Sequence, residues 1–236
     1  MDFLDLVFPK KCVTCGREGS YFCPKCLVTV KRVKQICPVC GGSTPFGQAH
    51  PFCGKRDCPD GLISLFAYTG VIKDAIHKLK YKFVTDLENE FWRIVKNDLE
   101  KREEELTVFK RFSDDEKPMV VPIPLHRLKE NFRGFNQSSL FGKRLADLWK
   151  LQFSNKILVR RKNVPSQTKL TQKEREENVK GIFDLAPNIL PTASISFALN
   201  ILLVDDVWTT GATMKEATRV LKQGGVKRVW GMTIAR

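Results

Sequence analysis

The sequence predicts an α/β protein, in which helices flank a parallel sheet, preceded by a small cysteine-rich module. Strand-like apolar stretches alternate with stretches of helical period from residue 61 onward, an order typical of parallel sheets. All eight cysteines lie before residue 59. A chain of 236 residues can hold one medium domain and one small one, so we expect a module over residues 1–60 and a second domain over residues 61–236.

The cysteines form four close pairs with the spacing of metal-binding knuckles. They are Cys12 and Cys15, Cys23 and Cys26, Cys37 and Cys40, and Cys53 and Cys58. A tetrahedral Zn²⁺ ion takes four such ligands, and eight cysteines therefore match two structural zinc sites. A disulfide framework fits less well, because we see no export signal and residues 59–236 contain no cysteine. Four successive pairs also argue against a redox motif.

The pairing of these ligands is open. Sequential pairing puts Cys12 to Cys26 in one site and Cys37 to Cys58 in the other, but a crossed arrangement is possible. His50 is an alternative ligand in the second site, although a loop histidine is more often simply exposed.

The elements of the larger domain follow from hydrophobic periodicity. We expect strands at 62–69, 119–125, 156–161, 181–185, 201–206 and 226–235, and helices at 71–82, 86–106, 136–151 and 211–223. Acidic residues after 106 indicate a loop, and a turn follows residue 125. Residues 166–180 are polar and basic without an apolar stripe, which predicts a mobile loop with a helical turn.

The termini and the charge restrict the function. Residues 1–9 have no basic residue before their apolar part, and we expect a short helix or arm that docks on the body. No apolar run approaches the roughly 18–20 residues that span a bilayer, so we expect a cytoplasmic protein without membrane insertion. The net charge is +14, of which residues 125–180 supply +9 (14 basic minus 5 acidic). Such an excess favours an anionic partner, either phosphate groups or a nucleic acid, although a solvated basic face is the alternative.

The stretch ILLVDDVWTTGAT (201–213) carries the strongest functional signal. An apolar strand ends in Asp205 and Asp206, and the turn after it leads into a helix N-terminus, which suits a phosphate. Gly211 lets the backbone approach a ligand closely. The two carboxylates would repel that phosphate, but they suit a sugar diol or a Mg²⁺ ion. A loop that binds both a phosphate and a polyhydroxyl group suggests that the ligand contains a ribose 5-phosphate.

Two other nucleotide-binding motifs are missing. A P-loop requires G-x-x-x-x-G-K-[ST], and Gly142-Lys143 lacks the first glycine and is followed by Arg144. The G-x-G-x-x-G fingerprint of dinucleotide folds is also absent. A turn in which the two acids act only as caps is a minor alternative.

Residues 201–213 resemble the phosphoribosyl-diphosphate (PRPP) signature of type I phosphoribosyltransferases. Two further segments, VPIPLHRLKENFRGFNQSSLFGKRLA and RRKNVPSQTKLTQKEREENVKGIF, are similar to motifs of the ComF family of competence-associated proteins. The CxxC module in front matches that family as well. The resemblance covers nearly the whole chain, and it implies a type I phosphoribosyltransferase-like domain behind a double zinc ribbon.

The resemblance assigns roles to individual residues. Asp205 and Asp206 would be the catalytic pair and hold the ribose hydroxyls, directly or through Mg²⁺. The 5-phosphate would be surrounded by Thr209, Thr210, Gly211, Ala212 and Thr213. The diphosphate would lie near His126, Arg127 or Lys129, with Arg133 as a further anion ligand, because arginine makes bidentate phosphate contacts. The loop that closes over it would carry Lys169, Lys173 and Arg175.

Three classes of function remain open at this point. The first is an enzyme that transfers phosphoribosyl to an unidentified base or amine, a reaction that depends on positioning and charge stabilisation. The second, which the resemblance implies, is a competence protein that binds PRPP–Mg²⁺ and single-stranded DNA, with a competence helicase as a partner. Phe132, Phe135 and Phe141 lie among basic residues and could stack on bases, although core packing suits Phe141 better. The third is a helicase adaptor regulated by PRPP.

Overall fold

The computed structural model describes residues 9–54, 57–81, 85–102, 104–162, 172–187 and 200–236. The predicted arm at the N-terminus and Lys169 lie outside these residues, as do the side chains of Lys173 and Arg175. Within the described residues no helix combines the length and the apolar character that crossing a membrane requires.

The central sheet has four parallel strands in the order β1-β6-β5-β2, which confirms the predicted α/β class. The strands are β1 (Gly61–Phe66), β2 (Met119–Pro122), β5 (Asn200–Val207) and β6 (Arg228–Ala235). The helices around it are α3 (Gly70–Tyr81), α4 (Thr85–Glu100), α5 (Thr107–Glu116), α6 (Arg127–Arg133), α7 (Gln137–Trp149), α8 (Gln172–Val179) and α9 (Ala212–Gln223).

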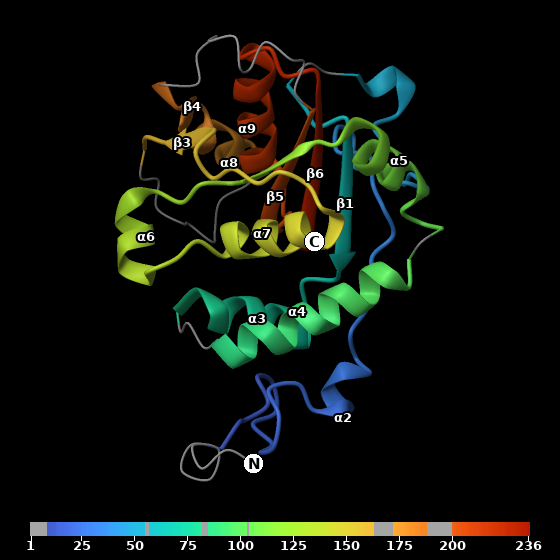
Figure 1. Cartoon of the computed structure of the whole chain (residues 1–236), viewed down its shortest axis with the longest axis vertical. Coiled ribbons are helices and arrows are strands. Elements are labelled where there is room, and N and C mark those ends of the chain that lie inside the picture. Colours follow the sequence, from blue (N-terminus) through green and yellow to red (C-terminus); the bar gives the residue numbers. More distant parts are fainter. Residues whose placement is uncertain (1–8, 55–56, 82–84, 103, 163–171, 188–199) are drawn as a thin grey trace.

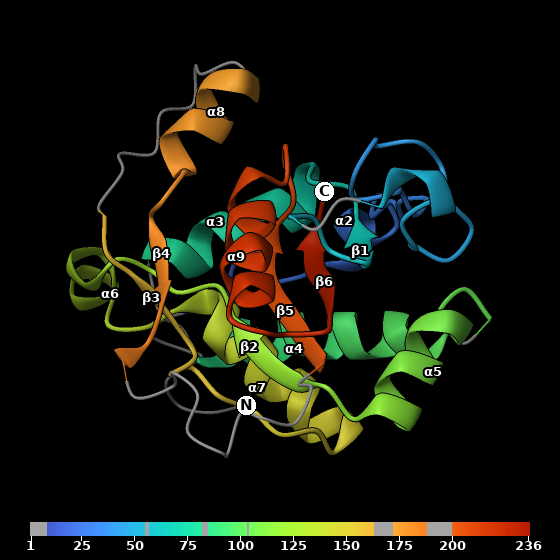
Figure 2. The same ribbon diagram turned by 90° about the horizontal axis from the view of Figure 1, so that it is seen from above.

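Side chains alternate between two cores, one on each face of the sheet. Leu202 and Val204 of β5 belong to the core that α3, α4, α5 and α7 cover, whereas Ile201 and Leu203 face α9. Figures 1 and 2 show these two helical layers on either side of β5 and β6. Because parallel strands lie between two layers, they are buried on both faces and read as continuous apolar runs.

Three predicted features need correction. The strands β3 (Leu158–Arg160) and β4 (Phe183–Leu185) form a separate antiparallel pair instead of joining the parallel sheet. Residues 107–116, predicted as a loop, are helix α5, because Phe109 and Phe112 are buried against Trp230. The turn after residue 125 contains helix α6, in which the imidazole of His126 accepts a hydrogen bond from the N–H of Leu128.

The N-terminal module is divided between the two ends of β1. The first ribbon includes the short helix α2 (Pro24–Leu27) and packs on α4, where the rings of Phe22 and Phe91 stack 5.8 Å apart. The second ribbon contains the 3₁₀ turn η1 (Pro51–Cys53) and is joined to β1 where that strand begins, by a bridge from Gln48 to Gly61. In Figure 1 the first ribbon lies at the lower end of the molecule and η1 near the top.

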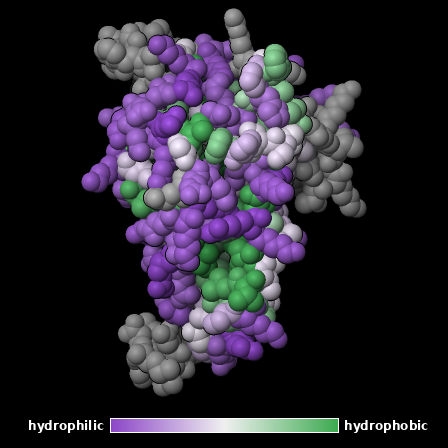
Figure 3. Space-filling view, turned by 90° about the vertical axis from the view of Figure 1, so that its right-hand side faces the viewer, coloured by the Kyte–Doolittle hydropathy of each residue, from purple (hydrophilic) through white to green (hydrophobic). Residues whose placement is uncertain are grey.

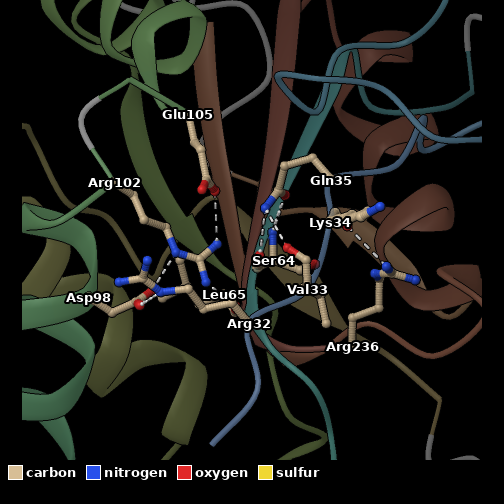
Figure 4. A network of polar contacts seen from close by, with 10 residues as sticks. All are labelled: Arg32, Val33, Lys34, Gln35, Ser64, Leu65, Asp98, Arg102, Glu105 and Arg236. Carbon is tan, nitrogen blue, oxygen red and sulfur yellow. Dashed lines mark hydrogen bonds and ion pairs between the residues drawn. The ribbon is translucent and has the colours of Figure 1, made fainter.

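The segment between the two ribbons runs along the outer edge of β1. Val33 donates a backbone hydrogen bond to Leu65, and the carboxamide of Gln35 pairs with the backbone of Ser64 in both directions. Figure 4 shows this segment beside β1, with a neighbouring network of charged side chains. Because an uncovered edge strand can pair with another chain, this segment protects the sheet.

The surface of the molecule is largely hydrophilic. On the side that Figure 3 shows, apolar side chains gather in one patch in the lower half, toward the first ribbon. Isolated apolar side chains are exposed elsewhere; Phe52 of the second ribbon and Phe132 of α6 are 102% and 83% exposed.

Candidate functional site

The first metal-binding group forms as the sequential pairing predicts. One ligand atom from each of Cys12, Cys15, Cys23 and Cys26 lies within 4.8 Å of the others. The sulfurs of Cys15 and Cys23 are 3.6 Å apart, and tetrahedral zinc–sulfur bonds of about 2.3 Å place two sulfurs about 3.8 Å apart. These four side chains therefore fit one zinc ion.

The thiols of this group affect one another's ionisation. Burial raises the pKa of Cys12, but N–H groups of Cys15, Cys23 and Thr14 outweigh it and bring that pKa down to about 6. Burial and the neighbouring thiols raise the pKa of Cys26 to about 12. Cys26 thus holds its proton more tightly than an ordinary thiol, and a divalent cation bound by the group would supply the positive charge that favours its thiolate.

The second group contains His50, whereas the sequence predicted Cys58. Its members are Cys37, Cys40, His50 and Cys53. The Nδ1 atom of His50 lies 3.4 Å from the sulfur of Cys40 and 3.8 Å from that of Cys53. Its Nε2 atom lies 3.1 Å from the carbonyl oxygen of Ser43. When Nε2 donates to that carbonyl, Nδ1 presents a lone pair to the group, as in many zinc-bound histidines.

Cys58 lies outside this second group because the chain beyond η1 is held against α9. The ammonium of Lys222 donates to the carbonyl of Cys58 at 3.1 Å and to the carboxylate of Asp60 at 2.8 Å. Cys58 also lines a pocket with residues of α9, such as Lys215 and Arg219. The sequence spacing therefore identified the metal-binding module, and His50, which the sequence offered as the alternative ligand, takes the place of Cys58 in the second group.

The acid pair lies at the carboxyl end of β5, as predicted. Asp205 is held by the hydroxyl of Ser138, which donates to Oδ1 at 2.8 Å, and by the N–H of Asp206 at 2.9 Å. Burial and the charge of Asp206 raise the pKa of Asp205 to about 7, although Ser138 partly offsets them. Asp206 forms an ion pair with Lys80 of α3, with 2.6 Å between Oδ2 and Nζ.

The loop after the acid pair has the shape that a phosphate-binding turn requires. Gly211 has a φ of +76° and begins α9 as its N-cap. A Cβ atom at this position would lie 2.1 Å from the Trp208 ring, so a residue larger than glycine does not fit. Thr209 is exposed, while Thr210 and Thr213 are half-buried and Ala212 is buried. The loop therefore leads directly to the N-terminus of α9, where free N–H groups favour an anion.

A second loop follows β2, the strand next to β5. Asn136 fixes it, because its side chain donates to the carbonyl of Ile123 at 3.0 Å and accepts from the N–H of Ser138 at 3.0 Å. Arg133 ends α6 and donates to Gln137 at 3.3 Å. Arg127 is exposed, and the imidazole of His126 caps α6. Arg133 thus contacts Gln137, the neighbour of Ser138, while His126 and Arg127 lie at the start of α6.

Three cations of this region lie close together. Burial, Arg160 and Arg133 lower the pKa of Lys129. Burial lowers the pKa of Arg160, and the charge of Asp205 raises it in part. Arg160, at the end of β3, is thus coupled electrostatically to Asp205 and to Lys129, and we refer to Lys129, Arg133 and Arg160 as the positively charged wall.

An apolar cleft borders Asp206. It is narrow, with a cavity volume of about 40 Å³. Its walls come from α3, α4 and α7, with Trp92, Phe135 and Phe141 among the aromatic side chains.

Sequence reasoning missed Lys80, Ser138 and Arg160. Each comes from a different element, and none stands in a motif that shows its role. Ser138 and Arg160 do lie in the two segments that resemble the ComF family, and Arg160 also ends a predicted strand in the basic segment, whereas Lys80 had no signal in the sequence.

Comparison with known proteins supports the same reading of the chain. A double zinc ribbon domain model matches residues 3–60. Competence protein F of Haemophilus influenzae is 34% identical over 120 residues, 49% of this chain, and the match spans half the length (50%) of that protein. Competence protein ComFC of Bacillus subtilis is 29% identical over 230 residues, 91% of this chain and 83% of the relative. DNA utilization protein YhgH of Escherichia coli K12 is 27% identical over 211 residues, 88% of this chain and 86% of that protein. The chain is therefore similar to competence and DNA utilization proteins over most of its length, and its residues 3–60 match a double zinc ribbon.

Proposed function

We propose that this protein binds PRPP together with Mg²⁺ at the carboxyl ends of β5 and β2, and that it binds single-stranded DNA during DNA uptake. The observation that carries the proposal is the acid pair Asp205–Asp206, followed by the positive-φ Gly211 at the start of α9. The acids would hold the ribose hydroxyls or Mg²⁺, and the α9 N-terminus would hold the 5-phosphate.

The positively charged wall completes the proposed site. A diphosphate is strongly anionic, and Lys129, Arg133 and Arg160 are cations whose mutual repulsion an anion would relieve. A bound Mg²⁺ would share the diphosphate charge with these side chains.

Calorimetry with PRPP and Mg²⁺ tests the proposed site, with ribose 5-phosphate as the control ligand. We expect saturable binding that prefers PRPP and weakens at least tenfold in Asp206→Asn, a loss of about 1.4 kcal/mol. Asp147→Asn is the matched control, because Asp147 lies exposed on α7. Absence of PRPP binding in the wild type, or equal affinity in Asp206→Asn, would overturn the proposal.

The proposed DNA function has a specific candidate surface. Phe132 is 83% exposed on α6, which also carries Arg127, Lys129 and Arg133. Phe141, by contrast, is 5% exposed and packs against Trp92, which excludes it from stacking on bases. Exposed aromatic rings among cations are typical of surfaces that bind single strands. The names of the relatives, competence proteins and DNA utilization proteins, agree with such a role.

Fluorescence anisotropy with a labelled single-stranded oligonucleotide tests this surface. We expect binding that weakens steeply with salt and a loss of about 1–3 kcal/mol in Phe132→Ala. Phe52→Ala removes an equally exposed ring from the second ribbon and should change the affinity little. A larger loss of affinity in Phe52→Ala than in Phe132→Ala would indicate that DNA binds at the second ribbon and not at α6.

A second candidate function is phosphoribosyl transfer to an aromatic base or amine. The apolar cleft favours it, because this cleft borders Asp206 and a planar acceptor would lie against Trp92 and Phe135 once the cleft widens. Release of pyrophosphate from PRPP in the presence of nucleobases, but not in Asp206→Asn, is the expected result. The proposed roles of a competence helicase as a partner, and of PRPP as a regulator of that contact, depend on the same binding site.

A further inference from the structure

Lys80 carries a positive charge into the acid pair from the last turn of α3. Its Nζ atom lies 2.6 Å from Oδ2 of Asp206, and the two side chains are only 23% and 16% exposed. Burial lowers the pKa of Lys80, but the charges of Asp206, Tyr68 and Asp205 outweigh it, so the pKa is raised overall. Lys80 is therefore a cationic ammonium held against a carboxylate in a poorly hydrated place.

This ion pair uses the same carboxylate that a ribose hydroxyl or Mg²⁺ requires. An ammonium and a divalent cation compete for one carboxylate, because each binds it mainly through charge attraction and the two cations repel each other. Without Lys80, the two adjacent carboxylates would form a negative site that attracts free divalent cations, with no ammonium against Asp206 to repel them. With Lys80 in place, the net charge of the pair is much less favourable for a bare cation.

We propose that Lys80 is a built-in counter-ion of the acid pair, which makes the site discriminate against free Mg²⁺ and accept Mg²⁺ together with a diphosphate. This inference rests on the proposed PRPP site. In the ligand-free protein Lys80 neutralises Asp206. An incoming diphosphate brings negative charge of its own, which stabilises both Mg²⁺ and the displaced ammonium.

Binding of Mn²⁺, followed by electron paramagnetic resonance without any phosphoribosyl ligand, tests the inference on the zinc-loaded full chain. We expect Lys80→Met to bind Mn²⁺ about tenfold or more tightly than the wild type. Lys80→Arg keeps the charge and should bind Mn²⁺ as weakly as the wild type. Lys78→Met is the matched control, since Lys78 is exposed on the same turn of α3.

Two results would overturn the inference. The first is an unchanged Mn²⁺ affinity in Lys80→Met. The second is a gain in Lys80→Met that survives the added Asp206→Asn substitution, because the metal would then bind elsewhere. PRPP titration separates this inference from the proposed function. If the wild type does not bind PRPP but Lys80→Met binds Mn²⁺ more tightly, PRPP is not the ligand, and the role of Lys80 as a counter-ion is still supported.

Discussion

At the scale of single residues, Gly211 is constrained in two ways. Its φ of +76° disfavours other residues, and a Cβ atom would collide with the buried Trp208 ring at 2.1 Å. We expect Gly211→Ala to lower the free energy of unfolding by about 2–4 kcal/mol and to distort the loop. Denaturant unfolding measures the change in the free energy of unfolding.

Gly225 provides the comparison for that experiment. It also has a positive φ, +95°, but a Cβ atom there would meet nothing within 4 Å. Gly225→Ala should therefore cost only the backbone strain, about 1 kcal/mol. Similar losses in the two variants would mean that contact with Trp208 is unimportant.

Asp205 should make the stability of the ligand-free protein depend on pH. Its pKa rises to about 7 in the folded protein, so the native state binds this proton more tightly than the unfolded chain does. The contribution of Asp205 to stability is then most favourable below about pH 4, and it declines as the pH rises to about 7.

Replacing this carboxylate removes the penalty of charging it. We expect Asp205→Asn to be about 1–3 kcal/mol more stable than the wild type at pH 8 and nearly equal to it at about pH 4. Thermal unfolding at the two pH values, with Asp147→Asn as the control, provides the test. A variant that is less stable than the wild type at pH 8 would contradict the assigned burial penalty.

The site residues that could be predicted were those that form local patterns. Asp205, Asp206 and the turn at Gly211 are neighbours in the sequence, and their order reflects the strand, turn and helix that they form. Lys80 and Ser138 reach Asp206 and Asp205 from α3 and α7, through packing that no local pattern encodes. Periodicity shows which face of a helix is buried, but not which polar side chain at its end meets a partner.

At the scale of elements, the second metal-binding group offers a direct choice between two side chains. Because the structure groups His50 with the three cysteines, we expect His50→Ala to lose one of two zinc ions per chain. Cys58→Ser should keep both ions. Elemental analysis of freshly purified protein measures the content, and loss of zinc in Cys58→Ser alone would restore the assignment made from the sequence.

In the larger domain, helices α5 and α6 were not predicted, for different reasons. Helix α5 contains Ser113, Asp114 and Asp115, which resemble a loop, yet Phe109 and Phe112 pack on Trp230. Helix α6 has only seven residues and no buried side chain, so it lacks an apolar stripe that periodicity could detect. The antiparallel pairing of β3 with β4 escaped prediction because both strands have only three residues.

At the scale of the whole molecule, a buried charge network joins the N-terminal module to the sheet. The guanidinium of Arg102 is fully buried; its Nη2 donates to the carbonyl of Leu65 at 2.6 Å, and its Nε lies 2.7 Å from Oδ2 of Asp98. Asp98 also accepts from Arg32, in the segment that covers β1, at 2.6 Å. Figure 4 shows how these side chains converge.

Breaking this network should destabilise the whole chain. Asp98→Asn leaves the buried Arg102 without its full counter-charge, and we expect a loss of about 3–5 kcal/mol. Glu105→Gln is the control, because Glu105 is 52% exposed and lies 3.5 Å from Arg102, so its loss should cost less than about 1 kcal/mol. Equal losses of unfolding free energy in the two variants would show that burial of the Arg102–Asp98 ion pair does not increase its contribution to stability.

The strand order has a consequence for how the protein is made. β6 lies between β1 and β5, and the side-chain contact between Ser64 and Thr233 joins residues 169 positions apart. On the ribosome, β1 and β5 emerge before the strand that separates them, and the gap between them must stay open until β6 has left the exit tunnel. The first ribbon, which needs only short-range contacts to gather its thiols, can take up metal long before that moment. A nascent chain arrested before β6 should therefore hold zinc in this ribbon while a protease still cleaves the region that becomes the sheet.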